Sequence, residues 1–292
     1  MKRMRLIATL GTLALLTATL VGAAGEADPP EELKVVFIAY ENPDQLVEDV
    51  RPVVAYFKEQ TGLPVKHFVA TDYSGVVEAL RNKTADVGFM GPLQYIMARR
   101  QTGAYPILGE VYNGKATYGS RIFVRKDSGI EGVEDLKGKT IAFVDPISSS
   151  GFMYPLQIFK DEGLITGEPE DFFRRIYFAG GDEQAIRAVY NGFVDAAGIG
   201  EYSFNLLRFD ERDEVISIAE SRKIPSHCVV VREELHEGTV EKLRSALLKL
   251  NDPEGPNHGL LKGLYNVDGY VKVTHEVYEP VEMLARDNGF IK

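Results

Sequence analysis

Apolar residues along this chain follow two alternating spacings, which predicts that strands and helices succeed one another from about residue 33. Residues 33–40 (LKVVFIAY) form an apolar run rich in β-branched residues, which is typical of a strand. Residues 44–60 carry apolar side chains at helical spacing, and Gly62 ends that helix. Further strands are expected at 64–70 and 86–90, with helices at 73–82 and 92–101. This series predicts a mostly parallel sheet covered on both faces.

A second series of the same kind begins near residue 120. Its expected strands are 120–124, 140–145, 175–179 and 195–199, and its expected helices are 133–139, 150–162 and 182–191. The tail adds strands at 215–219 and 228–231 and helices near 239–250 and 277–288. Two α/β series in one chain predict two lobes of similar size, and we expect the tail to return to the first lobe.

The first residues have the order of a secretory signal peptide. Lys2, Arg3 and Arg5 make a basic head, an uncharged and largely apolar segment follows at 6–24, and small residues mark the expected cut. The alternative is a transmembrane anchor, but the apolar core is short for a span of about 20 residues. We therefore expect 1–24 to be removed and the mature protein to be periplasmic.

Charge limits the partners of the mature chain. The sequence holds 33 Lys plus Arg and 43 Asp plus Glu, a formal net charge of −10, and loss of the three basic residues of the signal head makes it −13. Such a chain has no general attraction for nucleic acid or for acidic lipid. An anion would have to be held by local dipoles and hydroxyl groups. The single cysteine, Cys228, excludes an internal disulfide.

Three consecutive serines are the sharpest chemical signal. Residues 145–151 (DPISSSG) follow an apolar strand and precede a helical stretch. Hydroxyl groups and unpaired backbone N–H groups at a helix N-terminus form a site for an anion, because donors and helix dipole both point at the ligand. The competing interpretation is an ordinary serine-rich N-cap, which needs only one hydroxyl.

Several segments carry a resemblance to a known family. They are 145–155 (DPISSSGFMYP), 72–75 (DYSG) with 78–80 (EAL), 86–95 (DVGFMGPLQY), 126–130 with 135–139, and 191–197 (NGFVDAA). Over roughly residues 33–235 the chain resembles the phosphonate, phosphite and phosphate substrate-binding proteins of ABC transporters, the PhnD-like family. The serine loop and the Gly-Pro-to-Tyr segment are its narrow signals.

This resemblance implies an α/β fold of the type II periplasmic binding protein class. Two α/β lobes, joined by two crossover segments near 118–125 and 216–221, would close over the ligand. Lobe 1 is expected to comprise 31–117 plus 220–292, and lobe 2 is expected to comprise 118–219.

The resemblance also implies the ligand-binding residues. From lobe 2 these are Ser148, Ser149, Ser150 and the Gly151 amide. Tyr40 and Tyr95 would approach from lobe 1, and Tyr118 and Tyr202 lie near the expected cleft. For each tyrosine the alternative is half-buried packing with an outward hydroxyl group.

Position 182 departs from the family pattern. The family commonly carries a histidine after the preceding glycine step, whereas this chain has Gly180-Gly181-Asp182-Glu183. A carboxylate there would repel a fully ionised oxyanion but accept a hydrogen bond from a protonated one, or pair with a cationic tail, which argues against sulfate. The alternative is that Asp182 only caps the next helix.

The leading hypothesis is a periplasmic binding protein that captures a small oxyanion (phosphonate, phosphite or phosphate) for an ABC transporter permease. The alternative is a sensor subunit for arsenite or phosphate that presents its ligand to a histidine kinase. An enzyme is disfavoured because no acid–base pair or nucleophile arrangement stands out. The scattered histidines lack metal-ligand spacing, Cys228 is expected to be a buried strand residue, and we expect a monomer without cofactors.

Overall fold

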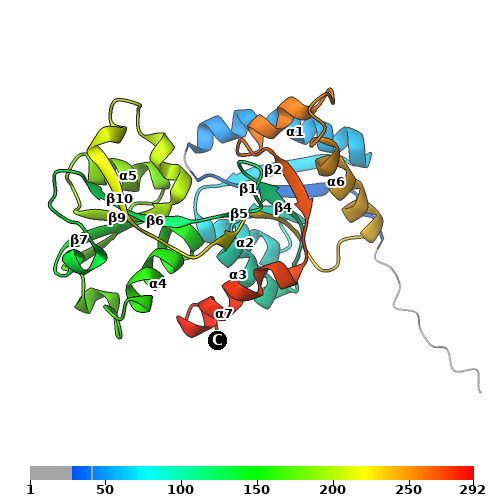
Figure 1. Ribbon diagram of the computed structural model, residues 1–292. Helices are drawn as coiled ribbons and strands as arrows, with labels where there is room; N and C mark the ends of the chain where they lie inside the picture. Colours follow the sequence, from blue (N-terminus) through cyan, green and yellow to red (C-terminus); the bar gives the residue numbers. More distant parts are fainter. Residues whose placement is uncertain (1–27, 41) are drawn as a thin grey trace, which may run out of the picture.

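The computed structural model describes residues 28–40 and 42–292, so the predicted signal peptide at 1–24 lies outside the described residues. Within the described part the chain forms two α/β lobes side by side (Figure 1). Among these described residues, no helix has the length and apolar character to cross a bilayer.

The first lobe is built on a mixed sheet in the order β13-β4-β12-β3-β1-β2. Its strands are β1 (Leu33–Ile38), β2 (Val65–Ala70), β3 (Val87–Met90), β4 (Tyr105–Val111), β12 (Cys228–Val231) and β13 (Gly269–Lys272). Its helices are α1 (Pro43–Thr61), α2 (Tyr73–Arg81), α3 (Pro92–Thr102), α6 (Glu237–Lys249) and α7 (Glu279–Asp287). Alternate residues of β1 enter different cores: Val35 and Phe37 pack with α1 and α6, whereas Val36 and Ile38 pack with α2 and α3. Both faces of the sheet are therefore buried.

The second lobe repeats this plan around a sheet in the order β10-β6-β9-β7-β8. Its strands are β6 (Ser120–Arg125), β7 (Thr140–Phe143), β8 (Arg175–Phe178), β9 (Ala196–Gly200) and β10 (Val215–Glu220), and its main helices are α4 (Tyr154–Asp161) and α5 (Asp182–Tyr190). Ile141 and Phe143 pack with α4, and Ala142 faces the cluster that includes α5. Short 3-10 turns complete the connections at Val133–Leu136, Pro169–Asp171, Glu201–Leu206, Arg212–Glu214, His258–Gly263 and His275–Tyr278.

The prediction of a mostly parallel sheet is wrong. In lobe 1 β1 is parallel to β2 and β3, but β12 pairs antiparallel with β3 and β4, and β13 pairs antiparallel with β4. In lobe 2 β7 is parallel to β8 and β9, whereas β6 is antiparallel to β9 and β10. The βαβ units give the parallel pairs, and the strands that follow or return from a lobe crossing run the other way. Strand β4 was also missing from the expected elements.

The lobes are connected by paired strands. Strand β5 (Thr117–Tyr118) lies antiparallel to β11 (Ile224–Pro225), with Tyr118 opposite Ile224. The chain enters lobe 2 through β5 into β6 and leaves it through β10 into β11 (Figure 1). The crossings therefore sit together at one edge of the interface, the arrangement of a hinge.

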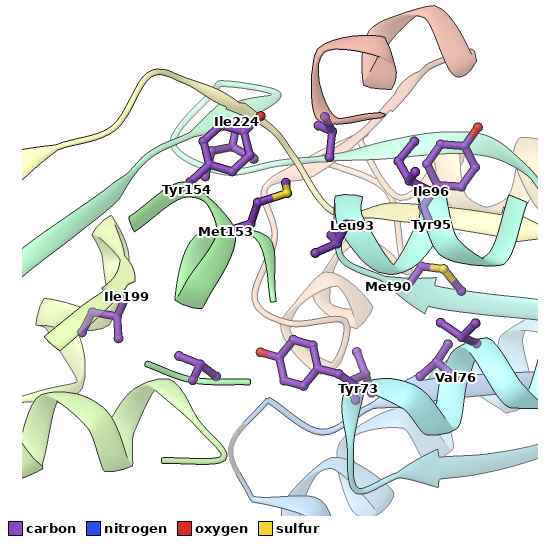
Figure 2. Close-up of a cluster of buried hydrophobic side chains, with 14 of the residues drawn as sticks. Tyr73, Val76, Met90, Leu93, Tyr95, Ile96, Met153, Tyr154, Ile199 and Ile224 are labelled. Atoms are coloured by element: carbon purple, nitrogen blue, oxygen red, sulfur yellow. The ribbon is translucent and has the colours of Figure 1, made fainter. Parts of the chain in front are cut away.

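Buried apolar side chains continue from one lobe to the other. Leu93 of α3 and Met153, ahead of α4, belong to one buried cluster and lie near each other in Figure 2. The C-terminal residues add a second bridge: the Asn288 side chain accepts a hydrogen bond from Lys160 at 2.7 Å and donates one to Gln157 at 3.0 Å, both on α4. The lobes thus contact one another in this conformation.

Candidate functional site

A cleft of about 670 Å³ opens between the lobes. Tyrosines dominate its wall: Tyr40, Tyr73, Tyr112, Tyr118, Tyr202 and Tyr265. Of the predicted site residues, the cleft brings together Ser148, Ser149, Ser150, Asp182, Tyr40, Tyr118 and Tyr202. The described wall therefore offers hydroxyl groups and aromatic surface more than charge.

The serine loop follows β7 and starts a helix. Residues Ser149–Met153 form a π-helical turn that continues into α4, and the Ser148 side chain caps it by accepting from the Gly151 N–H group at 3.0 Å. Glycine is required there, since a Cβ at 151 would lie 2.4 Å from the Val144 side chain. The three serines are buried at 4–8% exposure and line the cleft. The first N–H groups of a helix have no intrahelical acceptors; here Ser148 Oγ takes up that of Gly151, which leaves those of Ser149 and Ser150 as candidates to face an anion.

A second helix N-terminus meets this loop from lobe 1. Helix α3 begins at Pro92, and the side chain of Gln94 accepts from the Gly91 N–H group at 2.7 Å. The Leu93 N–H group of the same turn donates across the cleft to Ser149 Oγ at 2.8 Å. Two helix N-termini therefore converge on Ser149, and their dipoles both favour a negative charge beside it.

Asp182 is the first residue of α5 and faces the cleft from lobe 2. Its Oδ1 accepts from Ser203 Oγ at 2.7 Å and from the Gly200 N–H group at 3.3 Å. Burial raises the pKa of Asp182, and these two hydrogen bonds oppose the rise. The carboxylate thus has fixed partners on one side and an open face toward the ligand space.

The predicted tyrosines form parts of a larger aromatic wall. The Tyr40 ring lies 5.7 Å from the Tyr73 ring and 5.4 Å from the Tyr265 ring. The Tyr202 ring lies 6.1 Å from that of Tyr112. Within the described residues the buried hydroxyl groups of Tyr40 and Tyr118 have no hydrogen-bond partner. Such groups are donors that a ligand could satisfy.

Two predicted residues are placed elsewhere. Tyr95 is fully buried on the side of α3 that packs against the C-terminal segment, where its hydroxyl group meets His275 Nδ1 at 2.8 Å. Its ring points away from Leu93 in Figure 2, and it does not line the cleft. The Gly151 N–H group is already bonded to Ser148 Oγ. Cys228 is buried on β12, also away from the cleft wall.

The sequence reasoning missed several lining or supporting residues. Tyr73, Tyr112 and Tyr265 belong to the cleft wall, and His227 lies among them with Glu110 directly behind it. Tyr73 could have been found from its place at the first turn of a predicted helix. Glu110 lies on strand β4, and Tyr112 directly follows that strand. Because the strand was not predicted, the hydrophobic pattern did not indicate which side of the sheet either residue faces.

The electrostatics of the wall are unusual for an anion site. Asp49, Asp182 and Asp268 line it, and among the described lining residues Lys262 is the only lysine or arginine. Burial lowers the pKa of His227 to about 4, so its imidazole is neutral near pH 7. Backbone dipoles, serines and phenols must therefore supply most of the attraction for an anion.

Residues 35–278 match the model of a family described as "ABC transporter, phosphonate, periplasmic substrate-binding protein". The phosphate-import protein PhnD of Mycolicibacterium smegmatis is 32% identical over 203 residues, which cover 64% of this chain and 63% of that protein, less than two thirds of its length. The phosphonates-binding periplasmic protein of Escherichia coli is 27% identical over 249 residues, 82% of this chain and 72% of that protein.

Solved structures agree on the fold. PhnD1 from Prochlorococcus marinus, solved in complex with methylphosphonate, superposes with a TM-score of 0.78 at 21% identity, covering 89% of this chain and 99% of that one. A binding protein component of an ABC phosphonate transporter from Pseudomonas aeruginosa gives a TM-score of 0.76 at 24% identity, covering 88% and 86%. The α/β architecture with two lobes is thus the periplasmic binding protein fold expected from the sequence.

Proposed function

Because the chain belongs to the family of periplasmic substrate-binding proteins of phosphonate ABC transporters, we propose that it captures a small phosphorus oxyanion in its interlobe cleft. It would act in the periplasm as a monomer and deliver phosphonate, phosphite or phosphate to a membrane permease. No chemical conversion of the ligand is part of this function.

The observation that carries the proposal is the meeting of two helix N-termini at Ser149. The serine loop of lobe 2 supplies hydroxyl groups and the start of a helix, and the first turn of α3 in lobe 1 meets it at Ser149. Charge-assisted hydrogen bonds to an oxyanion contribute about 1.5–3 kcal/mol each, so a few of them suffice for strong binding without a cationic side chain. Ser148, Ser149 and Ser150 are the proposed ligand residues on this side.

The second part of the proposed site is Asp182 with the tyrosines. A carboxylate facing the ligand accepts a hydrogen bond from an oxyanion that keeps a proton, and repels one that has none. Phosphate keeps a hydroxyl group near neutral pH, as do the monoanions of phosphite and of a phosphonate, whereas sulfate does not. Tyr40, Tyr118 and Tyr202 would donate their phenol protons to the remaining oxygens or pack on a carbon substituent.

Ligand capture would be coupled to closure of the lobes. The serines and Asp182 belong to lobe 2, whereas Tyr40 and the N-terminus of α3 belong to lobe 1. A ligand that contacts both sets favours the closed conformation over any conformation in which the sets are apart. The permease would then recognise the closed form.

Calorimetric titration of the protein, freed of ligand by unfolding and refolding, tests this proposal. The panel is phosphate, phosphite, methylphosphonate, 2-aminoethylphosphonate, sulfate and arsenite. We expect tight binding of at least one phosphorus oxyanion and none of sulfate. Binding of sulfate or arsenite in preference, or silence across the panel, would show that the ligand class is wrong.

A further inference from the structure

His227 stands where the hinge meets the cleft. It lies two residues after the end of β11 and directly before β12, and its side chain is 20% exposed, at the cleft wall. The Nε2 edge of its ring lies beside Gly91, because a Cβ on Gly91 would be 3.3 Å from His227 Cδ2 and 3.6 Å from Nε2. Gly91 is the residue that caps α3, whose first turn reaches Ser149 through the Leu93 N–H group. The imidazole therefore adjoins the proposed oxyanion site from lobe 1.

Three tyrosine rings surround this imidazole. Their centroids lie 5.1 Å (Tyr40), 5.3 Å (Tyr118) and 6.3 Å (Tyr112) from that of His227. The electron-rich faces of phenol rings stabilise a neighbouring cation. The surroundings of His227 are thus suited to an imidazolium ion, although burial disfavours one while the cleft is empty.

Glu110 lies on the other side of the ring. Its carboxyl group is 3.8 Å from His227 Nδ1, which is buried and without a hydrogen-bond partner among the described residues. The backbone N–H of Glu110 donates to the His227 carbonyl at 2.9 Å, so the two residues are held opposite each other. Glu110 is 1% exposed and accepts a hydrogen bond from Tyr112. A buried carboxyl behind a histidine fixes the ring and stabilises its protonated form.

The other titratable groups near the pair are phenols. Three phenols of lobe 1 lie near Glu110: Tyr112, Tyr265 and Tyr270. Two others, Tyr40 and Tyr118, lie beside His227. Burial raises the pKa of all these phenols, so they stay neutral. Asp182 acts on Tyr118 from lobe 2, and Lys262 is the lysine of the cleft wall. Glu110 and His227 are thus the pair of groups in these surroundings that can gain, lose or exchange a proton beside the proposed ligand site.

We propose that His227 is a ligand-binding residue that becomes protonated when the oxyanion enters, with Glu110 as its buried counter-ion. This inference rests on the proposed function and adds to it a second positive charge on a cleft wall whose only described lysine or arginine is Lys262. The bound oxyanion and Glu110 would lie on opposite sides of the imidazolium, each accepting from one ring nitrogen. The same imidazolium would draw the ligand toward lobe 1 and so favour closure.

The proton balance follows from the state of the empty cleft. Burial lowers the pKa of His227 to about 4 and raises that of Glu110 to about 7. Above pH 7 the free protein holds no proton on the pair, so binding takes one from solvent and the association constant falls by about tenfold per pH unit. Well below pH 7 Glu110 already holds the proton, which moves to His227 on binding without net uptake.

The test is calorimetric titration with methylphosphonate in two buffers of different ionisation enthalpy, which gives the number of protons taken up. Wild type is compared with His227→Gln, with Glu110→Gln, and with the control His67→Gln on strand β2. The ligand's own ionisation is common to all four proteins and cancels in the differences. Thermal melting confirms that each variant is folded.

At pH 8 we expect wild type and His67→Gln to take up about one proton more than His227→Gln, with a tenfold or greater loss of affinity in that variant. The difference in proton uptake should disappear at pH 5.5. Glu110→Gln should bind more weakly than wild type and take up less than wild type at pH 8, which keeps the test decisive if His227→Gln does not fold. Equal uptake in wild type and the variants refutes the role of His227 while leaving the oxyanion function intact. No binding of any phosphorus oxyanion by wild type overturns the function itself.

Discussion

Replacement of Asp182 by Asn tests how the cleft would distinguish phosphate from sulfate. In wild type the carboxylate accepts from Ser203 Oγ and the Gly200 N–H group, and its free side faces the cleft. Phosphate can donate its hydroxyl group to this carboxylate near pH 7. Sulfate has no proton to donate, so its oxygen would face another negative charge.

The magnitude follows from two contributions. A hydrogen bond to a charged group is worth about 1.5–3 kcal/mol. The repulsion between two like charges about 4 Å apart, roughly 4 kcal/mol at the effective dielectric of a protein surface, acts on both anions, because phosphate near pH 7 is negatively charged too. The hydrogen bond therefore predicts that wild type binds phosphate about 10–100-fold more tightly than sulfate. In Asp182→Asn the repulsion is gone for both anions and the charge-assisted hydrogen bond is lost for phosphate alone, so sulfate should gain on phosphate by about 10–100-fold.

The assay is titration of both anions into wild type, Asp182→Asn and Glu183→Gln at about pH 7. Glu183 is the matched control, since it is the next residue of α5, carries the same charge and pairs with Arg187 at 2.8 Å, away from the cleft lining. We expect the phosphate-to-sulfate ratio to collapse only in Asp182→Asn. If that variant melts at a lower temperature but keeps the wild-type ratio, Asp182 is a structural partner of Ser203 and our reasoning fails.

Three further outcomes are expected. Substituting Ser149 and Ser150 together by Ala should cost about 1.5–3 kcal/mol for each hydrogen bond lost to the oxyanion, so binding measured by calorimetry should weaken by at least tenfold while the circular dichroism spectrum stays unchanged. Unaltered affinity would mean that the loop is only a helix cap. Glu110→Gln should raise the free energy of unfolding by roughly 3 kcal/mol at pH 8, because the folded-state pKa of Glu110, about 7, lies above the ordinary 4.5 and stability is lost as the pH rises between these values. Urea titrations should show this gain at pH 8 and no gain at pH 4. An equal gain at both pH values would contradict the prediction. The double variant Asn288→Ala, Phe290→Ala should remove about 1–3 kcal/mol of contact energy between the lobes and increase the radius of gyration of the ligand-free protein in X-ray scattering. An unchanged radius of gyration would show that the C-terminal residues do not hold the lobes together.

Local patterns sufficed for most elements. The strand predicted at 228–231 is β12 without adjustment, and the helix predicted at 44–60 is α1 at Pro43–Thr61. Asp72, directly before the helix predicted at 73–82, caps α2 by accepting from the Gly75 N–H group at 2.8 Å. These features depend on side chains a few residues apart, which a sequence displays directly.

Strand β4 was missed because Pro106 and Gly109 interrupt its apolar run. Both residues are disfavoured within strands, so local propensity argued against an element that pairing with β12 and β13 stabilises. Because the strand was not predicted, Glu110 and the cleft-wall residue Tyr112 were not placed either. Tyr95 shows the complementary difficulty: the helix was predicted, but its hydroxyl partner, His275, lies 180 residues away in sequence.

The contacts between the lobes bear on how affinity is set. Ser149 Oγ accepts from the Leu93 N–H group of lobe 1, and Asn288 bridges to α4 with the Phe290 ring 5.6 Å from that of Phe152. These contacts stabilise the closed arrangement without any ligand contribution. Apparent affinity is the intrinsic affinity of the closed form multiplied by its population, so residues that never touch the ligand can change the dissociation constant. Ser149 would act on both factors, because the hydroxyl that would bind the oxyanion also joins the lobes. Its loss should therefore cost more affinity than the loss of Ser150.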